Sequence, residues 1–528
     1  MDYSKMNFQQ KKNILPVAKL FTEKVHKETG KTFLKFRMVA RGDCQEVNLY
    51  ESKSVAAPTV SSFGLFSVLK ISAGNNHHRR FVDVGTAFLC ANRDGKAEDV
   101  FMEIPPHLTE ILVQLKPEFK AFQRKDGSLI VKNLKAVYGE RSAPLLWYME
   151  ISRTLRQLGY ERSDNEPCVF IKDGPNGKHF IVVYVDDSMI SSTDLAEVDR
   201  VHKVFVEKYK KITVTPELNG KVKFIGLDLD FSIKNQVTVS GPSYVDKLVA
   251  EMNITSSVAT PMRSEANVSD SDGKELTKRM AKIFRTNVAR SLYMATKFRP
   301  DILFAVNTLT RRVQNPTVDD WNQLIHLGKY LFGTKDFGVT LSSGVFKIDA
   351  YIDASYACHS DSKSHTGLAL FMDGACLAAK SVKQKIVTKS STEAELIGLS
   401  DMLNLVTYAA DLMKELGIQV ETPTVYQDNK STITLIMSET GANDKTKHLK
   451  LKVNWVKQEL KNKKVIVKWI PTGDMVADIL TKPLQGALFR KHRQKLLNLP
   501  EHQLVDKDVD KRVILMLRSM KKQVSKKV

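Results

Sequence analysis

Two neighbouring aspartates, Asp186 and Asp187, follow the most strand-like apolar run of the sequence, in FIVVYVDDSMI. Adjacent carboxylates repel, and desolvating either is costly unless it finds a partner. Asp83 likewise interrupts an apolar run, RRFVDVGTAFL. Because neighbouring strand residues point to opposite faces, the pair can serve one site only at a turn. Two interpretations stay open here: a solvent-screened hairpin tip, or three carboxylates that share divalent metal ions.

A second acidic set begins with Asp353, inside the strand-like run YIDASY, and continues on a helix in STEAELIGLSDMLNLVTYAADLMKELG. Ser390 and Glu393 form a capping-box pattern at the start of that helix, and Gly417 ends it. At about 100° per residue, its apolar face consists of Leu399, Met402, Leu403, Val406, Ala410 and Met413. Glu395 falls within this face, whereas Glu393 points well away from it. We therefore expect Glu395 to face the sheet and Glu393 to serve the helix terminus.

Two more acids complete this set. Asp428 ends the strand-like run PTVYQD, and Asp478 lies in the short helical segment GDMVADILTK. Strand ends and helix edges of an α/β sheet can converge four carboxylates on one metal pair. Two metal ions about 3.5–4 Å apart stabilise the attacking and leaving oxygens of a phosphoryl displacement. Taken singly, each acid is more typical of a cap or a solvated surface group.

Asp228 and Asp230 in FIGLDLDF are a tempting further pair. They alternate along a strand, so that both can face solvent while Leu227 and Leu229 face the core. We interpret them as surface residues.

Composition narrows the function classes. The chain has 528 residues and a net charge of +21, with 80 Lys and Arg against 59 Asp and Glu. This excess favours polyanionic partners, nucleic acid or an anionic membrane, unless the protein is merely basic and soluble. No apolar stretch reaches the roughly 18 residues of a membrane span, and the N-terminus has no signal-peptide core. Five scattered cysteines argue against a disulfide framework or zinc site and for a reducing compartment.

The order of strand-like and helical patterns predicts an α/β and α+β multidomain protein. Strand and helix patterns alternate over residues 13–250, and a polar linker with a helical connection covers residues 251–345. A second series of strands and helices spans residues 346–497. Residues 498–528 form a basic C-terminal tail, ending MKKQVSKKV.

Four motifs in order, VDVGTAFL, LKAVYGERSAPLLWY, YVDD and KFIGLDL, closely resemble the reverse transcriptase of copia-type LTR retrotransposon Pol polyproteins. The resemblance implies a right-hand polymerase with fingers, palm and thumb. It also implies that Asp83, Asp186 and Asp187 hold the catalytic metal ions. Glu140 and Ser142 depart from the family, whose members usually carry Leu and Gln there.

The same resemblance suggests the substrate contacts. Phe88 falls on the aromatic position that shields against a ribose 2′-OH. The basic strand LKFRMVARG is similar to the segment that grips the incoming triphosphate, which makes Lys35, Arg37 and Arg41 candidates. The remaining candidate substrate-binding residues are Tyr138, Gly139 and Tyr184.

Residues beyond position 346 resemble the RNase H domain that follows reverse transcriptase in this family. The matching phrases are DASY, STEAEL, VYQDNKSTI, KHLKLKVNWVKQEL and IPTGDMVADILTKPL. They imply metal ligands at Asp353, Glu395, Asp428 and Asp478, with two Mg²⁺ ions per active site, or Mn²⁺ in their place. WIPTGD holds no histidine for the mobile catalytic position, and His448 is expected to pack or to contact the nucleic-acid backbone. In the helical connection, Arg299, Pro300 and Asp301 are interpreted as structural.

The implied function is an RNA- and DNA-templated DNA polymerase with RNase H activity in retrotransposon replication. Its partners would be an RNA template, a DNA primer, an RNA–DNA hybrid and dNTPs, and no membrane. The chain resembles only the C-terminal polymerase and RNase H part, since no protease or integrase motif occurs in it. The implied location is the cytoplasm, a virus-like particle or the nucleus, without secretion. The alternative is a non-catalytic nucleic-acid-binding remnant of a truncated element.

Overall fold

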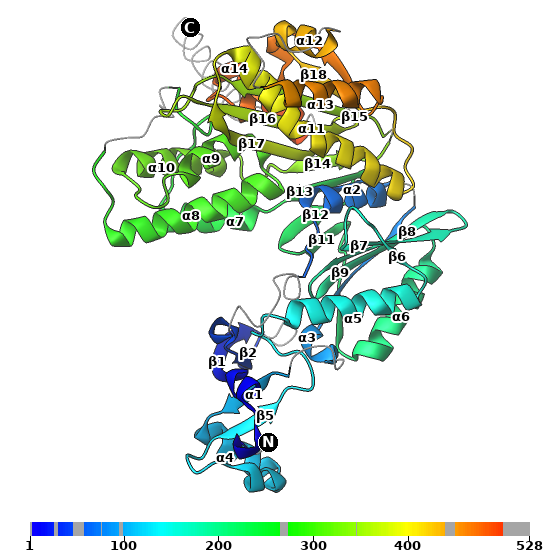
Figure 1. Ribbon diagram of the computed structural model, residues 1–528, viewed down its shortest axis with the longest axis vertical. Helices are drawn as coiled ribbons and strands as arrows, with labels where there is room; N and C mark the ends of the chain where they lie inside the picture. The colour runs from blue at the N-terminus through cyan, green and yellow to red at the C-terminus, as the bar shows by residue number, and fades with distance from the viewer. Residues whose placement is uncertain are drawn as a thin grey trace, which may run out of the picture. The chain divides into compact units, whose positions relative to one another are not determined.

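A computed structural model describes residues 3–25, 30–45, 57–74, 76–93, 99–264, 273–344, 346–438 and 449–499. The chain divides into two compact units (Figure 1). Unit 1 comprises Met1–Val60 and His78–Thr215, and unit 2 comprises Ser61–His77 and Pro216–Val528. His448 and the tail after residue 499 lie outside the described residues. Both units combine helices with sheets, so the predicted α/β multidomain character is confirmed at that level.

Unit 1 contains a four-stranded sheet in the order β2-β1-β4-β5. Its strands are β1 (Ile14–Val25), β2 (Thr32–Ala40), β4 (Phe101–Ile104) and β5 (Leu129–Lys132), and helix α4 spans Pro106–Leu115. The buried side chains Leu15, Val100, Ile104 and Leu129 share one core cluster, against which Leu108 and Leu112 of α4 pack. β1 and β2 form a long antiparallel hairpin that carries the basic segment LKFRMVARG.

A six-stranded sheet in the order β10-β3-β9-β8-β7-β6 forms the rest of unit 1. Its strands are β3 (His78–Val84), β6 (Glu161–Arg162), β7 (Val169–Gly174), β8 (Gly177–Tyr184), β9 (Asp187–Ser192) and β10 (Ile212–Thr215). Helices α3 (Ala87–Cys90), α5 (Ala143–Gln157) and α6 (Leu195–Tyr209) accompany it (Figure 1). On α5, Trp147, Ile151 and Leu155 recur every four residues and are fully buried, which is the period of one helix face. This face and the apolar strands make a single core.

Unit 2 contains a second four-stranded sheet, β11-β12-β13-β14, with its helical layer. The strands are β11 (Lys221–Phe224), β12 (Leu227–Asp230), β13 (Gln236–Ser240) and β14 (Val339–Ser342), and the helices are α7 (Pro242–Glu251), α8 (Lys278–Lys297), α9 (Leu303–Thr310) and α10 (Val318–Gly333). Leu227 and Leu229 are buried, whereas Asp228 and Asp230 are only partly covered and pair with surface lysines. The interpretation of this aspartate pair as surface residues is confirmed.

The third part of unit 2 is a five-stranded sheet in the order β17-β16-β15-β18-β19. Its strands are β15 (Ile348–Ser355), β16 (Lys363–Met372), β17 (Ala375–Val387), β18 (Thr424–Gln427) and β19 (Ile466–Trp469). β15 pairs antiparallel with β16 and parallel with β18, so its end meets the end of β18 at one edge. The long helix α11 (Ser391–Glu415) packs on β15 and β16. The other helices are α12 (Lys430–Met437), α13 (Lys450–Lys461) and α14 (Gly486–Leu497).

Arg299 and Asp301 form a buried ion pair in unit 2. Both are almost fully buried, and the guanidinium donates to both carboxylate oxygens at 2.9 and 2.8 Å. Arg299 also donates to Thr334, and the Tyr330 hydroxyl donates to Asp301 at 2.5 Å. A buried charge pair of this kind needs such additional hydrogen bonds. The structural role predicted for Arg299 and Asp301 is confirmed.

Helix α2 (Ser62–Ala73) belongs to unit 2, although the residues before Ser61 and after His77 belong to unit 1. It is apolar all round and nearly every residue is buried, as expected for a helix enclosed by neighbours. Its one charged side chain, Lys70, is fully buried and pairs with Asp373 at 3.0 Å. Lys70 also donates to the carbonyl of Ser342 in β14, so α2 is attached to the sheets of unit 2.

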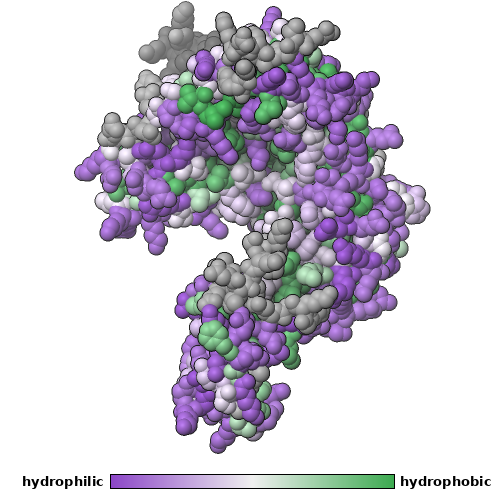
Figure 2. Space-filling view, in the orientation of Figure 1, coloured by the Kyte–Doolittle hydropathy of each residue, from purple (hydrophilic) through white to green (hydrophobic). Residues whose placement is uncertain are grey.

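Hydrophilic residues predominate on the visible face of each unit, and hydrophobic ones gather only in scattered groups (Figure 2). Within the described residues, every helix is too short or too polar to span a membrane.

Candidate active sites

Asp186 and Asp187 lie at the tip of the hairpin between β8 and β9. Tyr184 pairs with Asp187, which leaves Val185 and Asp186 as the two-residue loop. Val185 has φ 55°, an unfavourable conformation for a β-branched residue, so the tip is strained. The buried Trp147 indole N–H donates to the Val185 carbonyl and supports this loop. The predicted hairpin tip is confirmed, and it presents both carboxylates at a turn.

Asp83 lies directly beside this tip. In the β3–β9 ladder Asp83 is the partner of Asp187, and the Val84 N–H donates to the Asp186 carbonyl at 2.8 Å. Burial, followed by the charges of Asp186 and Asp83, raises the pKa of Asp187 to about 6. The structure therefore brings the three aspartates of the first set together, and the charges of Asp186 and Asp83 act on the Asp187 pKa in the same direction as its burial.

Tyr138 and Phe88 lie near the same acids. Their ring centroids are 4.8 Å apart. Burial and then the negative charge of Asp186 raise the pKa of the Tyr138 hydroxyl, while Arg37 acts in the opposite direction. Tyr138 is thus within electrostatic reach of a candidate metal ligand and of a candidate triphosphate contact.

Gly139 holds the Tyr138 segment against the end of β2. It has φ +91°, and a Cβ there would lie 2.0 Å from the carbonyl oxygen of Ala40. The Ala40 N–H donates to the Tyr138 carbonyl at 2.8 Å. Both the conformation and the space require glycine at this position. Gly139 thus lets the Tyr138 segment approach β2 closely, and substrate binding by Gly139 stays a prediction.

The other candidate substrate-binding residues lie on β2, just after it, and at the end of β8. Lys35 and Arg37 alternate on β2 and therefore share one face of the hairpin. Arg41 follows β2, is exposed, and pairs with Asp43 at 2.6 Å. Tyr184 is half-buried at the end of β8. Glu140, where the family usually has Leu, is buried and pairs with Arg93 and Asn133, which accommodates its charge.

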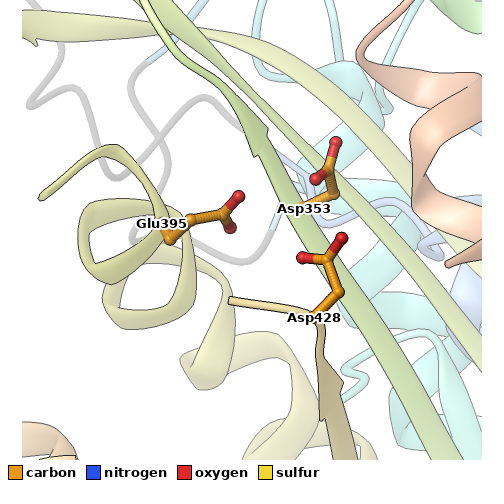
Figure 3. A group of neighbouring side chains, drawn as sticks. All are labelled: Asp353, Glu395 and Asp428. Carbon is orange, nitrogen blue, oxygen red and sulfur yellow. The ribbon is translucent and has the colours of Figure 1, made fainter. Parts of the chain in front are cut away.

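The second set forms a compact cluster in unit 2. Asp353 lies on β15, Glu395 in the first turns of α11, and Asp428 directly after β18 (Figure 3). Their carboxylates point toward one another, with one oxygen of each within 4.8 Å of the others. Within the part of the chain that the structure describes, it is the one group of three such ligands at this spacing.

The two glutamates in the first turns of α11 differ as the helical periodicity predicts. Glu395 faces the sheet and accepts a hydrogen bond from the Gln427 amide at 3.2 Å. Burial, and then the charges of Asp353 and Asp428, raise its pKa well above the ordinary value. Glu393 accepts from the Lys389 N–H at 2.8 Å, and its own N–H bonds to Ser390, so it serves the helix terminus. It is nevertheless buried, since neighbouring segments cover this end of the helix.

Asp478 is linked to the cluster by Lys482, which contacts both Asp478 and Asp353. It lies in a short 3₁₀ helix, η9 (Val476–Leu480). Lys482 donates to Asp478 at 2.6 Å and lies 3.5 Å from Asp353. Burial and the Asp353 charge raise the pKa of Asp478 to about 7, against the opposing effect of Lys482. Burial alone would lower the pKa of Lys482, but the two carboxylates outweigh it and raise that pKa.

Sequence reasoning missed several residues that contact these acids, among them Lys482, Thr472 and Trp469. Lys482 neutralises part of the acidic charge, and the only available signal was its position four residues after Asp478. Thr472 donates from its hydroxyl to the Asp428 carboxylate at 2.8 Å. The Trp469 indole N–H donates to the Asp428 carbonyl at 3.1 Å. Both lie in VKWIPTGD, which the sequence identified only as lacking a histidine.

The donor set of each site fits a divalent cation. Carboxylate oxygens are the hard ligands that Mg²⁺ and Mn²⁺ prefer. In unit 2 burial, and then the like charges of Asp353 and Asp428, raise the pKa of Glu395, and a bound divalent ion would offset both effects. In unit 1 burial and then the charges of Asp186 and Asp83 raise the pKa of Asp187 in the same way.

A family model described as "Reverse transcriptase (RNA-dependent DNA polymerase)" matches residues 3–264. The Retrovirus-related Pol polyprotein from transposon RE2 of Arabidopsis thaliana is 27% identical over 482 residues, 90% of this chain. The Transposon Ty1-DR5 Gag-Pol polyprotein of Saccharomyces cerevisiae is 25% identical over 479 residues, 86% of this chain. The chain belongs to the copia-type retrotransposon Pol polyproteins. It carries their reverse transcriptase domain, and the copia-type identity predicted from the motifs is confirmed.

This copia-type chain spans between a quarter and a third of the length of its curated relatives, 31% of the Arabidopsis protein and 26% of the yeast one. Among solved structures, the protease–reverse transcriptase of prototype foamy virus aligns with 90% of this chain and 52% of its own, at 11% identity and a TM-score of 0.23. A compost-derived RNase H1 aligns with 26% of this chain and 94% of its own, at 18% identity and a TM-score of 0.21. At TM-scores this low, neither alignment supports an assignment of site residues.

Proposed function

We propose that this copia-type chain is an RNA-directed DNA polymerase coupled to an RNase H. The observation that carries the proposal is that acids meet at sheet strands in both units: Asp83 pairs with Asp187 beside the hairpin tip in unit 1, and Asp353, Glu395 and Asp428 form a compact cluster in unit 2. Unit 1 would supply the palm and fingers of a right-hand polymerase, and the five-stranded sheet of unit 2 the RNase H-like domain. The partners would be an RNA template, a DNA primer, dNTPs and an RNA–DNA hybrid.

In the polymerase, Asp83, Asp186 and Asp187 would hold divalent ions, which activate the primer 3′-OH and bind the triphosphate. The strained hairpin tip presents Asp186 and Asp187 to one site, and Asp83 lies opposite Asp187. Lys35 and Arg37 on one face of β2 would pair with the triphosphate charges. Phe88, held against Tyr138, would leave no room for a ribose 2′-OH.

In the RNase H-like domain, Asp353, Glu395, Asp428 and Asp478 would hold the ions that activate water against an RNA phosphodiester. Gln427 orients Glu395, and Thr472 orients Asp428, by direct hydrogen bonds. Lys482 keeps the Asp353–Asp478 edge partly neutral before metal binds.

Primer extension on an RNA template, with Mg²⁺ and with EDTA, tests the polymerase. The Asp186→Asn variant should lose extension at least a hundredfold while its melting temperature stays near the parent's, since only the charge that binds metal is removed. An inactive parent that still binds primer–template would instead establish a non-catalytic nucleic-acid-binding remnant. Asp186→Asn extending at the parental rate would overturn the metal assignment.

A further inference from the structure

An exposed tryptophan is attached to the backbone of one of the clustered acids. Trp469 ends β19 and pairs in the ladder with Gln427 of β18. Its indole N–H donates to the carbonyl of Asp428 at 3.1 Å, yet 49% of the residue is exposed to solvent. The ring therefore has a fixed orientation and an uncovered surface directly beside the carboxylate cluster.

A cation lies over the same ring. Lys430 begins α12, two residues after Asp428, and its side chain is exposed. The Lys430 ammonium lies 4.7 Å from the centroid of the Trp469 ring, within the range of a cation–π contact. Asp428 thus has an aromatic ring and a positive charge close to it. Thr472, which follows β19 in the chain, donates a hydrogen bond to the Asp428 carboxylate.

This combination matches the chemistry of one nucleotide. Aromatic side chains bind nucleic acid by stacking on bases or packing on sugars, and an adjacent cation binds phosphate. Sequence preference is not expected, because every base and sugar offers an apolar face. The exposed half of Trp469 is therefore open to such a contact beside the candidate metal ligands.

We propose that Trp469 and Lys430 form a substrate-binding site for the RNA strand, one that takes the nucleotide next to the scissile phosphate. The sugar or base of that nucleotide packs on the Trp469 ring, and its phosphate pairs with Lys430. The inference rests on the proposed RNase H function and extends it, because it assigns the residues that align the strand with Asp428. These two residues bind substrate and take no part in the chemical step.

Steady-state hybrid cleavage by the full chain tests the site. Trp469→Ala should raise KM about tenfold and change kcat less than threefold, because one stacking contact is lost. Trp469→Phe retains a ring and should keep KM within about threefold. Lys430→Gln should reduce the slope of log KM against log salt by about one, the effect of one phosphate contact. Trp321→Phe, a half-buried residue on α10, is the matched control and should behave as the parent.

Binding without catalysis provides a second readout. The chain has 4 tryptophans, and hybrid added in EDTA should quench a fraction of their fluorescence that Trp469→Phe removes and Trp321→Phe retains. The proposed site would be refuted if the unmodified chain cleaves hybrid and Trp469→Ala leaves KM unchanged while Lys430→Gln leaves the salt dependence of KM unchanged. A parent that cleaves no hybrid but shows the Trp469 quench would overturn the RNase H function alone. Equal quench from both phenylalanine variants would also refute the site.

Discussion

The ammonium of Lys482 lies 2.6 Å from Asp478 and so occupies carboxylate oxygens that a divalent ion would need. Lys482→Gln should therefore strengthen metal binding at this cluster by roughly tenfold, because a competing positive charge is removed. Mn²⁺ binding measured by EPR in an Asp186→Asn, Asp187→Asn background reports this cluster without the polymerase site. Lys452→Gln, which removes a surface lysine paired with Asp401, should leave the affinity unchanged. Weaker Mn²⁺ binding in Lys482→Gln would contradict the competition.

Glu395→Gln should abolish hybrid cleavage and spare primer extension, because the carboxylate belongs to the unit 2 cluster alone. Glu393→Gln should reduce cleavage only a fewfold. It weakens the cap at Lys389 and should lower stability by about 1 kcal/mol, a typical value for a helix cap. Cleavage, extension and thermal melting are measured on the same preparations. Similar losses of cleavage from both variants would refute the distinction between the two glutamates.

Phe88→Ala should increase incorporation of ribonucleotides relative to deoxynucleotides by at least tenfold while deoxynucleotide synthesis stays measurable. The ring that contacts Tyr138 would no longer exclude a 2′-OH. Phe205→Ala, at a fully buried core position, is the control for stability. It should cost roughly 3–5 kcal/mol without changing the incorporation ratio. If Phe88→Ala likewise loses stability without changing the incorporation ratio, Phe88 is a core residue and does not exclude the 2′-OH.

Metal affinity of the unit 2 cluster should rise as pH increases through about 7. In the metal-free protein, burial and Asp353 raise the pKa of Asp478 to about 7, so this carboxyl is protonated below that pH. A protonated carboxyl cannot ligate, and metal binding must release its proton. The Mg²⁺ concentration for half-maximal hybrid cleavage should fall between pH 6 and pH 8. Asp478→Asn should flatten this dependence in Mn²⁺ binding, and an unchanged dependence would assign the proton to another group.

Local patterns in the sequence predicted much of the candidate sites. Helical periodicity distinguished Glu395 from Glu393, and strand alternation placed Asp228 and Asp230 at the surface. The turn required for Asp186 and Asp187 follows from the alternation of strand side chains. Each of these inferences depends on residues a few positions apart.

Contacts between distant segments were not predictable in this way. Lys482 meets Asp353 and Trp469 meets Asp428 only because the sheet brings their segments together. A single sequence shows neither the partner nor the distance in such cases. The catalytic roles and the domain boundaries at 250, 345 and 497 therefore stay predictions.

The attachment of α2 has an evolutionary consequence. The chain enters unit 2 at Ser61, returns to unit 1 at His78, and the ammonium of Lys70 meets Ser342 and Asp373 far downstream. A template switch between two related elements anywhere from residue 78 to residue 338 would join the helix of one parent to the sheets of the other. Viable recombinants should therefore come from parents that have compatible residues both in α2 and at its downstream partners. The gene segments that encode α2 and these partners should then be inherited together.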